Sequence, residues 1–475
     1  MSGNIKDNLG YFAILSSLSY LLAFAINRSP AFSLTVIREN VAAVEGYWFV
    51  EEWFEITYSG TLFPLGIFLK LLYCMAALIG TSSLVLFFAG IGRRIYDTED
   101  KKILVPTLSA IVGGVAFIIS VLGVFAFTID NATQLQEPIP FAIAFAIGGV
   151  ADIVIPPLAT LLVFGGVLVT IFGVGMISYQ NPNDIFSKPI RLLGIIVGIL
   201  GAFWFSNLPI LDLNALSNLR LFLVPSQYIF GLSFLLLIEW LFLAGLTLIG
   251  NEGSNSMRGS LFLATGILVL TSALIGLAVP LSSPKADLFQ FLLDWNSAAN
   301  VKTLHLLLST ISAFMVLLAL ASLYCQSRDI WSRREKLQIF LVHLGSLVAV
   351  KALSDLSFIK YAAMDFPEAP PAALPGISAS ARVAIANGMI PLVVGGVLTL
   401  ILGIGIISFR VFANSKLRIQ RFIGLILTVL GIGYFGLLFE EPIFSVTLMI
   451  VNISGVVLSL WMFAAGVLFW RKGSF

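Results

Sequence analysis

One carboxylate stands out in this 475-residue chain, because Glu239 lies in the middle of a long apolar stretch. It falls about twelve residues into the segment 227–249, between Ile238 and Trp240. If that segment crosses a bilayer, an ionised carboxylate at its centre costs at least ~2.5 kcal/mol, so Glu239 is expected to be protonated, paired or beside water. Two roles follow: a proton or cation site, or a neutral Glu that hydrogen-bonds to a neighbouring helix.

A second polar set lies in the apolar segment 337–360, which contains His343, Lys351 and Asp355. Lys351 and Asp355 are four residues apart, so on a helix they share a face and can form an ion pair. His343 lies on the adjoining face. Polar side chains within a membrane span face protein or water rather than lipid. This set therefore predicts a pathway for substrate or protons, with a structural ion pair as the alternative.

Two further titratable side chains fall at matching positions of two apolar segments. Aligning the stretch that begins at Arg93 with the one that begins at Arg328 places Lys70 opposite His305. Both lie toward the same end of their segments, and we expect them to face one vestibule. A lysine that extends to the membrane surface would explain Lys70 equally well.

The sequence lacks the common catalytic and cofactor motifs. It contains no P-loop, no glycine-rich dinucleotide fingerprint, no His-Glu-x-x-His and no Cys-x-x-Cys. Its two histidines are too few for a protein with two bis-histidine haems, and no nucleophile–base set is visible. We therefore expect no enzyme activity, no cofactor and no metal site. The net charge of +2 gives no indication of nucleic-acid binding.

The composition predicts an all-α integral membrane protein embedded in the lipid bilayer. Hydrophobic residues make up 59% of the chain and charged residues 11%, against about 25% charged residues in an average soluble domain. Twelve apolar segments have the length of a transmembrane helix, about 20 residues or more. They are 9–27, 66–92, 103–129, 152–178, 190–208, 227–249, 259–281, 303–325, 337–360, 383–408, 418–438 and 443–470.

Charged residues between these segments predict the orientation of the chain. The even-numbered connections are short and basic, as in Gly92–Lys102 and Gln326–Lys336, whereas the odd-numbered ones are longer and acidic. Lysine and arginine mark the cytoplasmic side of a membrane protein. Both termini are therefore expected in the cytoplasm, with the protein in the plasma (cytoplasmic) membrane.

A glycine-rich stretch occurs twice and indicates an internal duplication. The stretch 161–178 recurs as 391–408, with matching residues 230 positions apart. We predict two tandem, parallel six-helix repeats, 1–250 and 251–475, related by a pseudo-two-fold axis along the membrane normal. The repeated glycines are expected to serve close helix packing or to let these helices flex. They are Gly165, Gly166, Gly173, Gly175, Gly395, Gly396, Gly403 and Gly405.

The long outer connection 28–64 belongs to the first repeat alone. Within it, 45–60 mixes tryptophan, tyrosine and phenylalanine with glutamate. Such a segment is typical of an aromatic belt at the membrane surface. The alternative is a lid or a docking surface for partner subunits.

Twelve spans in two parallel halves with cytoplasmic termini resemble the topology of the major facilitator transporters. The basic motif that follows the second helix in that family is matched here only by Gly92-Arg93-Arg94, without its Asp-Arg pair. The resemblance is therefore one of architecture, and no motif places the chain in a specific family. We expect a secondary transporter, with its substrate near the middle of the bilayer between the two copies and with proton coupling through Glu239 or the Lys351–Asp355 set. A non-catalytic subunit of a larger membrane complex, such as a respiratory one, is the alternative.

Overall fold

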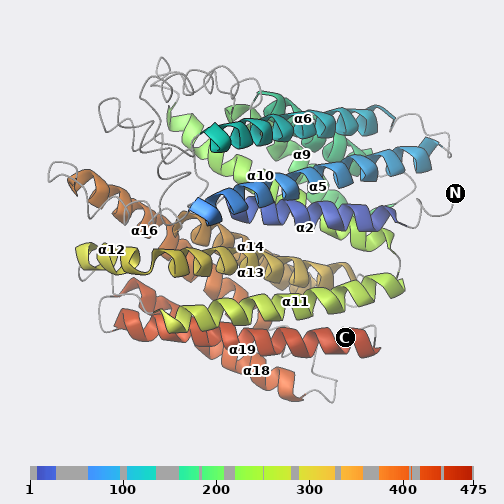
Figure 1. The fold of residues 1–475 in the computed structure, drawn as a ribbon. Coiled ribbons are helices and arrows are strands. Elements are labelled where there is room, and N and C mark those ends of the chain that lie inside the picture. The colour runs from blue at the N-terminus through green and yellow to red at the C-terminus, as the bar shows by residue number, and fades with distance from the viewer. Residues whose placement is uncertain are drawn as a thin grey trace. The chain divides into compact units, whose positions relative to one another are not determined.

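The computed structural model is helical in the part of the chain that it describes, with no strand in that part (Figure 1). The described residues are 8–27, 63–96, 104–134, 160–180, 185–207, 220–249, 251–279, 288–326, 333–356, 374–405, 408, 418–439 and 443–472. The chain divides into two compact units, with the boundary between the helices that end before Gly250 and those that begin at Asn251. Most helices are apolar on all sides, as expected for elements that face either lipid or protein.

The first unit is built from long helices that run alongside one another (Figure 1). α5 packs along α6, and α10 packs against α9 and its continuation η5. The elements are α2 (Leu9–Asn27), α5 (Phe63–Tyr96), α6 (Leu104–Gln134), a helix over 160–180 that includes η3 (Leu168–Gly175) and α8 (Met176–Gln180), α9 (Lys188–Leu200), η5 (Gly201–Asn207) and α10 (Arg220–Leu248).

In the described part of the second unit, long helices again follow one another, and the short helix α12 lies between the first two. α11 packs along α19, and α14 packs along α16. The elements are α11 (Asn251–Ala278), α12 (Leu288–Ser297), α13 (Ala299–Gln326), α14 (Arg333–Leu356), α16 (Leu374–Val397), η8 (Leu398–Gly405), α18 (Arg418–Gly433), η9 (Tyr434–Leu438) and α19 (Ile443–Lys472).

Within the described residues, ten helices are long and apolar enough to cross a membrane. This number identifies a polytopic membrane protein. Two predicted spans, 190–208 and 337–360, are not among the ten. The first is an α-helix over Lys188–Leu200 that continues as a 3₁₀-helix over Gly201–Asn207, and the second is an α-helix over Arg333–Leu356. Both predicted segments extend beyond the described residues, so the structure covers only part of each. The twelve-span count therefore stays a prediction.

The recurring glycine-rich stretch adopts the same unusual geometry in both units. Residues Leu168–Gly175 and Leu398–Gly405 each form a π-helical segment, wider than an α-helix by one residue per hydrogen-bonded turn. Helices pack at their closest where glycines remove side chains. A Cβ on Gly175 would lie 2.9 Å from the Cα of Gly198, and one on Gly173 would lie 2.7 Å from the Cβ of Ala110.

α2 and α10 of the first unit meet backbone to backbone. A Cβ on Gly245 would lie 2.6 Å from the carbonyl oxygen of Gly10 and 2.7 Å from Cγ1 of Ile14. A cross-helix hydrogen bond reinforces the contact, since the hydroxyl of Ser17 donates to the carbonyl oxygen of Ile238 over 2.8 Å. Only glycine at position 245 allows these helices to approach so closely.

Replacing this glycine tests the contact. Gly245→Ala is expected to lower the free energy of unfolding by about 1–3 kcal/mol, because the added methyl group forces two packed backbones apart. Val115→Ile is the control, since it also adds one carbon but at an exposed position on α6. Thermal unfolding of the purified protein measures both variants. Equal stability of Gly245→Ala and wild type would show that the two helices are not in contact.

Candidate functional site

A cavity of about 240 Å³ lies inside the second unit. Residues of α11, α12, α13, α14, α16, η8, η9 and α19 line it, so nearly every element of the unit contributes to its wall. Most of the lining side chains are aliphatic. A small number of polar groups set in an apolar wall is the usual construction of a small-molecule site.

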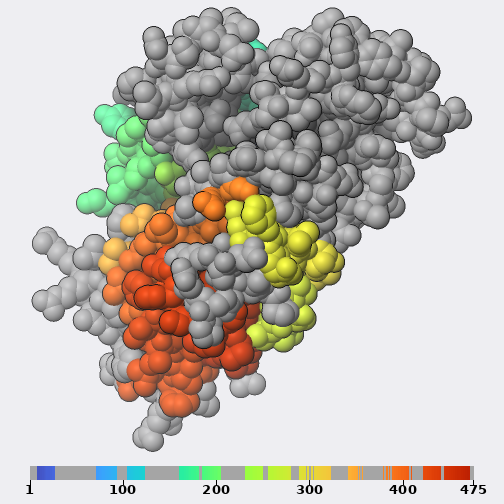
Figure 2. Space-filling model, turned by 90° about the vertical axis from the view of Figure 1, so that its left-hand side faces the viewer, coloured from blue at the N-terminus to red at the C-terminus, as the bar shows by residue number. Residues whose placement is uncertain are grey.

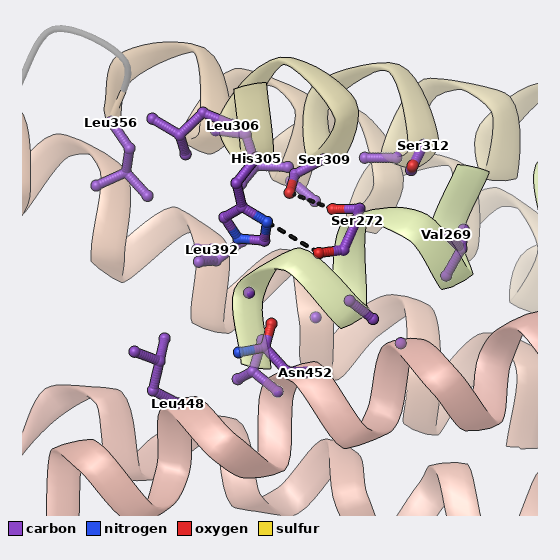
Figure 3. A pocket seen from close by; sticks show the side chains of 18 of the residues that line it. Val269, Ser272, His305, Leu306, Ser309, Ser312, Leu356, Leu392, Leu448 and Asn452 are labelled. Carbon is purple, nitrogen blue, oxygen red and sulfur yellow. Dashed lines mark hydrogen bonds between the residues drawn. The ribbon is translucent and has the colours of Figure 1, made fainter. Parts of the chain in front are cut away.

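Three polar side chains form a connected group at one side of the cavity (Figure 3). The ring of His305, on α13, places Nδ1 2.9 Å from the carbonyl oxygen of Ser272 on α11. The hydroxyl groups of Ser272 and Ser309 are 2.6 Å apart and share a hydrogen bond. These contacts join α11 to α13 and fix the imidazole against the cavity wall.

The partner of His305 decides which ring nitrogen carries a proton. A backbone carbonyl oxygen can only accept a hydrogen bond, so Nδ1 of His305 must donate to Ser272. A neutral His305 is then the Nδ1–H tautomer, with Nε2 left as an acceptor. The cavity wall therefore offers a hydrogen-bond acceptor at Nε2, or a second donor if the ring is protonated.

Asn452 of α19 faces His305 across a glycine (Figure 3). A Cβ on Gly276 would lie 2.3 Å from Oδ1 of Asn452 and 2.7 Å from Cε1 of His305. The absence of a side chain at position 276 thus allows an amide and an imidazole from different helices to converge. An amide adds both donor and acceptor capacity to the site.

Lys302 brings a positive charge to another part of the lining, although only 4% of this residue is exposed. Its ammonium group donates a hydrogen bond to the carbonyl oxygen of Asp294 and lies 5.9 Å from the ring centroid of Trp295. Burial lowers the pKa of Lys302 from its ordinary value, and the nearby Asp294 opposes this effect. Of these two opposed effects on the pKa, burial is the larger.

Two buried polar atoms of the lining have no hydrogen-bond partner in the structure. They are the hydroxyl oxygen of Ser312 and the indole Nε1 of Trp295. Ser312 is 5% exposed and Trp295 is 3% exposed. A buried polar atom without a partner costs roughly 1–3 kcal/mol. Both atoms therefore point to a group, such as water or a ligand, that hydrogen-bonds to them.

The short helix α12 packs over one end of the cavity. Phe291 and Trp295 line the cavity and belong to one apolar cluster with Leu356 of α14 and Ala381 of α16. In Figure 2 the yellow residues of α12 lie against the orange residues of α16. This helix carries the aromatic ring next to Lys302, so it shapes the charged part of the site.

Of the residues that the sequence singles out for a pathway, the structure places one, His305, in the cavity. Glu239 lies in α10 of the first unit and is 3% exposed. His343 is half-buried on α14. The side chains of Lys70, Lys351 and Asp355 lie outside the described part of the chain, as does the loop 45–60.

Several polar residues of the cavity have no functional prediction from the sequence, among them Ser272, Ser309, Asn452 and Lys302. Ser272, Ser309 and Asn452 are polar positions within apolar segments, which is the signal that could have singled them out. Lys302 precedes the predicted span 303–325, so it resembled a flanking charge. Among the described residues, no three of His, Cys, Asp and Glu gather closely enough to hold a metal ion.

The repeated glycines lie at close contacts rather than in the polar part of the cavity. Gly165 faces Gly113 and Phe117, and Gly403 faces Val342. Gly396 is one of the residues that line the cavity, and it contacts the ring of Tyr434, another lining residue.

The tautomer of His305 can be measured directly. In a His343→Gln variant labelled with ¹⁵N-histidine, His305 is the only histidine left of the chain's two. Its spectrum is expected to show a protonated Nδ1, because this atom donates to Ser272. A proton on Nε2 alone would contradict the hydrogen bond between α13 and α11.

The chain matches no protein-family model, no curated protein and no solved structure. The chemistry of the cavity and the contacts that form it therefore carry the functional argument.

Proposed function

We propose that the chain consists of two copies of one six-helix unit and spans the membrane twelve times. A ring packed on a glycine supports this in both units. In the first, a Cβ on Gly166 would overlap the ring of Trp204, 1.7 Å from Cε3. In the second, a Cβ on Gly396 would lie 2.3 Å from Cδ1 of Tyr434. Glycines and rings alike are 230 positions apart, the spacing of the repeated stretch.

Each of these rings also hydrogen-bonds to a serine of the last helix in its unit. Nε1 of Trp204 donates to the hydroxyl of Ser233 over 3.4 Å. The hydroxyl groups of Tyr434 and Ser454 are 3.0 Å apart. Both serines lie seven residues before the tryptophan of a Trp-x-x-x-Ala-Gly sequence. Two contacts of one kind at matched positions favour a duplication over chance similarity.

The copies differ where the second has its cavity. The two units can be aligned through the glycines at their helix contacts and through the Trp-x-x-x-Ala-Gly sequence. In this alignment, five aromatic residues of the first unit match five residues that line the cavity. The first set is Tyr20, Phe24, Phe117, Trp204 and Phe234, and the second, in the same order, is Val269, Ala273, Ala349, Tyr434 and Gly455.

In the first unit these rings pack against one another. Phe117 stacks on Trp204 with ring centroids 5.6 Å apart, and Phe234 packs edge-on against Trp204 at 6.1 Å and against Tyr20 at 5.5 Å. Smaller residues at four of the five matching positions leave the second unit hollow. The same scaffold is thus closed by an aromatic core in one copy and open in the other.

We infer from this cavity that the protein is a secondary transporter, and that its second copy binds the solute. The observation that carries the inference is a hollow with convergent polar groups inside a bundle of apolar helices. Transporters bind their substrates among polar groups within the bundle, near the middle of the bilayer. The short basic connections favour termini on the cytoplasmic side, and we propose the cytoplasmic membrane as the location of the protein.

Glu239 is our candidate for proton coupling. It is 3% exposed, whereas Leu460, its counterpart in the second copy, is 52% exposed. A carboxyl group in an apolar helix binds and releases protons when its surroundings change, which is how carboxylates serve in proton-driven transporters. The candidate rests on burial and on the position in the helix, not on a contact with the cavity.

Filling the cavity tests the transport role. Ala349→Phe places in the second copy the ring that the first copy carries as Phe117, which lies against a glycine just as Ala349 does. Uptake into proteoliposomes under a proton gradient is expected to fall at least about tenfold, because the ring occupies the solute site. Labelled carboxylates, amino acids, sugars and organic cations form the panel.

Leu460→Phe is the matched control, since it adds a ring on the exposed side of α19 and is expected to leave uptake unchanged. Equal uptake by Ala349→Phe and wild type would exclude the cavity as the solute site. A wild-type protein that accumulates none of the panel and purifies with stoichiometric partners would favour the non-catalytic subunit.

The coupling role of Glu239 is tested by separating uptake from accumulation. In Glu239→Gln, uptake down a concentration gradient is expected to persist, while accumulation driven by a pH gradient is lost, because the amide cannot titrate. Glu239→Asp keeps a carboxyl group and is expected to retain part of the accumulation. Wild-type accumulation by Glu239→Gln would leave this residue with a packing role alone.

A further inference from the structure

We propose that the cavity of the second unit binds a small monocarboxylate with an apolar body, whose carboxylate group pairs with Lys302. The proposal deepens the transport role and rests on it only for the statement that the bound anion is the solute that is moved. Binding itself follows from the charge, the hydrogen-bonding groups and the shape of the cavity.

Charge is the first argument. Lys302 lines the cavity, and none of the described lining residues is an aspartate or a glutamate. Among the described residues, the acid that acts on Lys302 is Asp294 of α12, which is half-buried and whose carboxylate also accepts a hydrogen bond from Gln290 over 2.7 Å. A buried cation is stable only with a partner of opposite charge. The site therefore favours an anion over a neutral or cationic molecule.

The hydrogen-bonding groups near Lys302 favour a carboxylate. An ammonium group has three donors, and the structure uses one of them for the carbonyl oxygen of Asp294. The indole N–H of Trp295, the residue whose ring lies under the ammonium, has no partner. A carboxylate offers two oxygens, each able to accept from a different donor. It can thus satisfy the ammonium and the indole together.

The remaining wall fits an apolar body. Aliphatic side chains from α13, α14, α16 and α19 face the cavity, among them Leu306, Leu353, Leu392 and Leu448. Lining residues of α13 run from Lys302 to Val316, which is about 20 Å along a helix. A dry cavity of about 150 Å³ holds benzene, so 240 Å³ leaves room for a short chain that ends in a carboxylate.

The matching positions of the first unit carry different groups. Aromatic side chains stand where the second unit has Val269, Ala273, Ala349 and Gly455, and Ala23 and Cys74 stand where it has Ser272 and Ser309. Ala23 and Cys74 belong to one apolar cluster, as expected if their counterparts are also in contact. One anion site per chain is therefore expected.

Equilibrium binding to the full chain in nanodiscs tests the proposal. The probes are labelled hexanoate, hexanamide and hexylamine, which share one alkyl chain and differ in charge. Specific binding is measured as the binding to wild type minus the binding to Ala349→Phe. Hexanoate is expected to bind at least about tenfold more tightly than hexanamide, since it adds a hydrogen bond to a charged group, and more tightly than hexylamine.

Variants of Lys302 test whether this residue causes the preference for hexanoate over hexanamide. Lys302→Met is expected to abolish the difference between hexanoate and hexanamide, and Lys302→Arg to keep it. Lys188→Met removes an equal charge from an exposed position on α9 and is expected to change nothing. If Lys302→Met does not fold, the shift in unfolding temperature caused by hexanoate, present in wild type and absent in Ala349→Phe, provides the measurement.

Equal binding of hexanoate and hexanamide, or an unchanged preference in Lys302→Met, would overturn the proposal. So would the absence of hexanoate binding that Ala349→Phe removes. Competition by palmitate would keep the carboxylate chemistry and assign its source to the bilayer. Hexanoate binding without uptake would refute transport alone, whereas uptake of a sugar or a cation without hexanoate binding would refute the anion site alone.

Discussion

The aromatic rings that surround a glycine-packed side chain distinguish the first unit from the second, because the glycine contact itself is present in both. In the first unit the indole of Trp204 covers Gly166 and stacks on Phe117, and further rings close the space around it. In the second unit Tyr434 covers Gly396 in the same way, but Ala349 offers no ring to stack on it. Aromatic side chains are the largest contributors to a packed core, so their loss at a few positions is enough to open a cavity.

An open space inside an apolar bundle is unfavourable unless something occupies it. The surrounding side chains lose contacts, and any polar atom facing the space lacks a partner. The cavity of the second unit carries both costs, because the hydroxyl of Ser312 and the indole N–H of Trp295 are buried without partners. Such an arrangement is understandable in a binding site, where a ligand replaces the missing contacts and hydrogen bonds.

The membrane class follows from the sequence, and so does the recurrence of the glycine-rich stretch, because apolar length and glycine spacing are local properties. The cavity does not follow from the sequence. His305 can be singled out as a titratable group in a span, but its bond to Ser272 depends on how α13 packs against α11. Serine in a helix commonly bonds to its own backbone, so its type alone predicts no partner across helices.

Lys302 and Glu239 show why the position of a charged residue in the sequence does not predict its role. Lys302 lies just before a predicted span, where a lysine usually extends to the membrane surface, yet it is buried beside Trp295 because α12 folds over that end of α13. Glu239 is the more conspicuous residue in the sequence, but it belongs to α10 of the other unit. The sequence shows where a charged residue lies in the chain, but the role of that residue depends on which helix packs over it.

Divergence of the two copies offers one explanation for the uneven distribution of polar groups. After a duplication, one copy can keep a solid core that maintains the scaffold, which frees the other to lose packing and to gain a site. Compared with the first unit, the second has fewer rings around Tyr434 and has the serine pair, Asn452 and Lys302 in their neighbourhood. Restoring a ring at Ala349 should therefore make the second unit more stable and less functional, because the same volume cannot serve packing and binding at once.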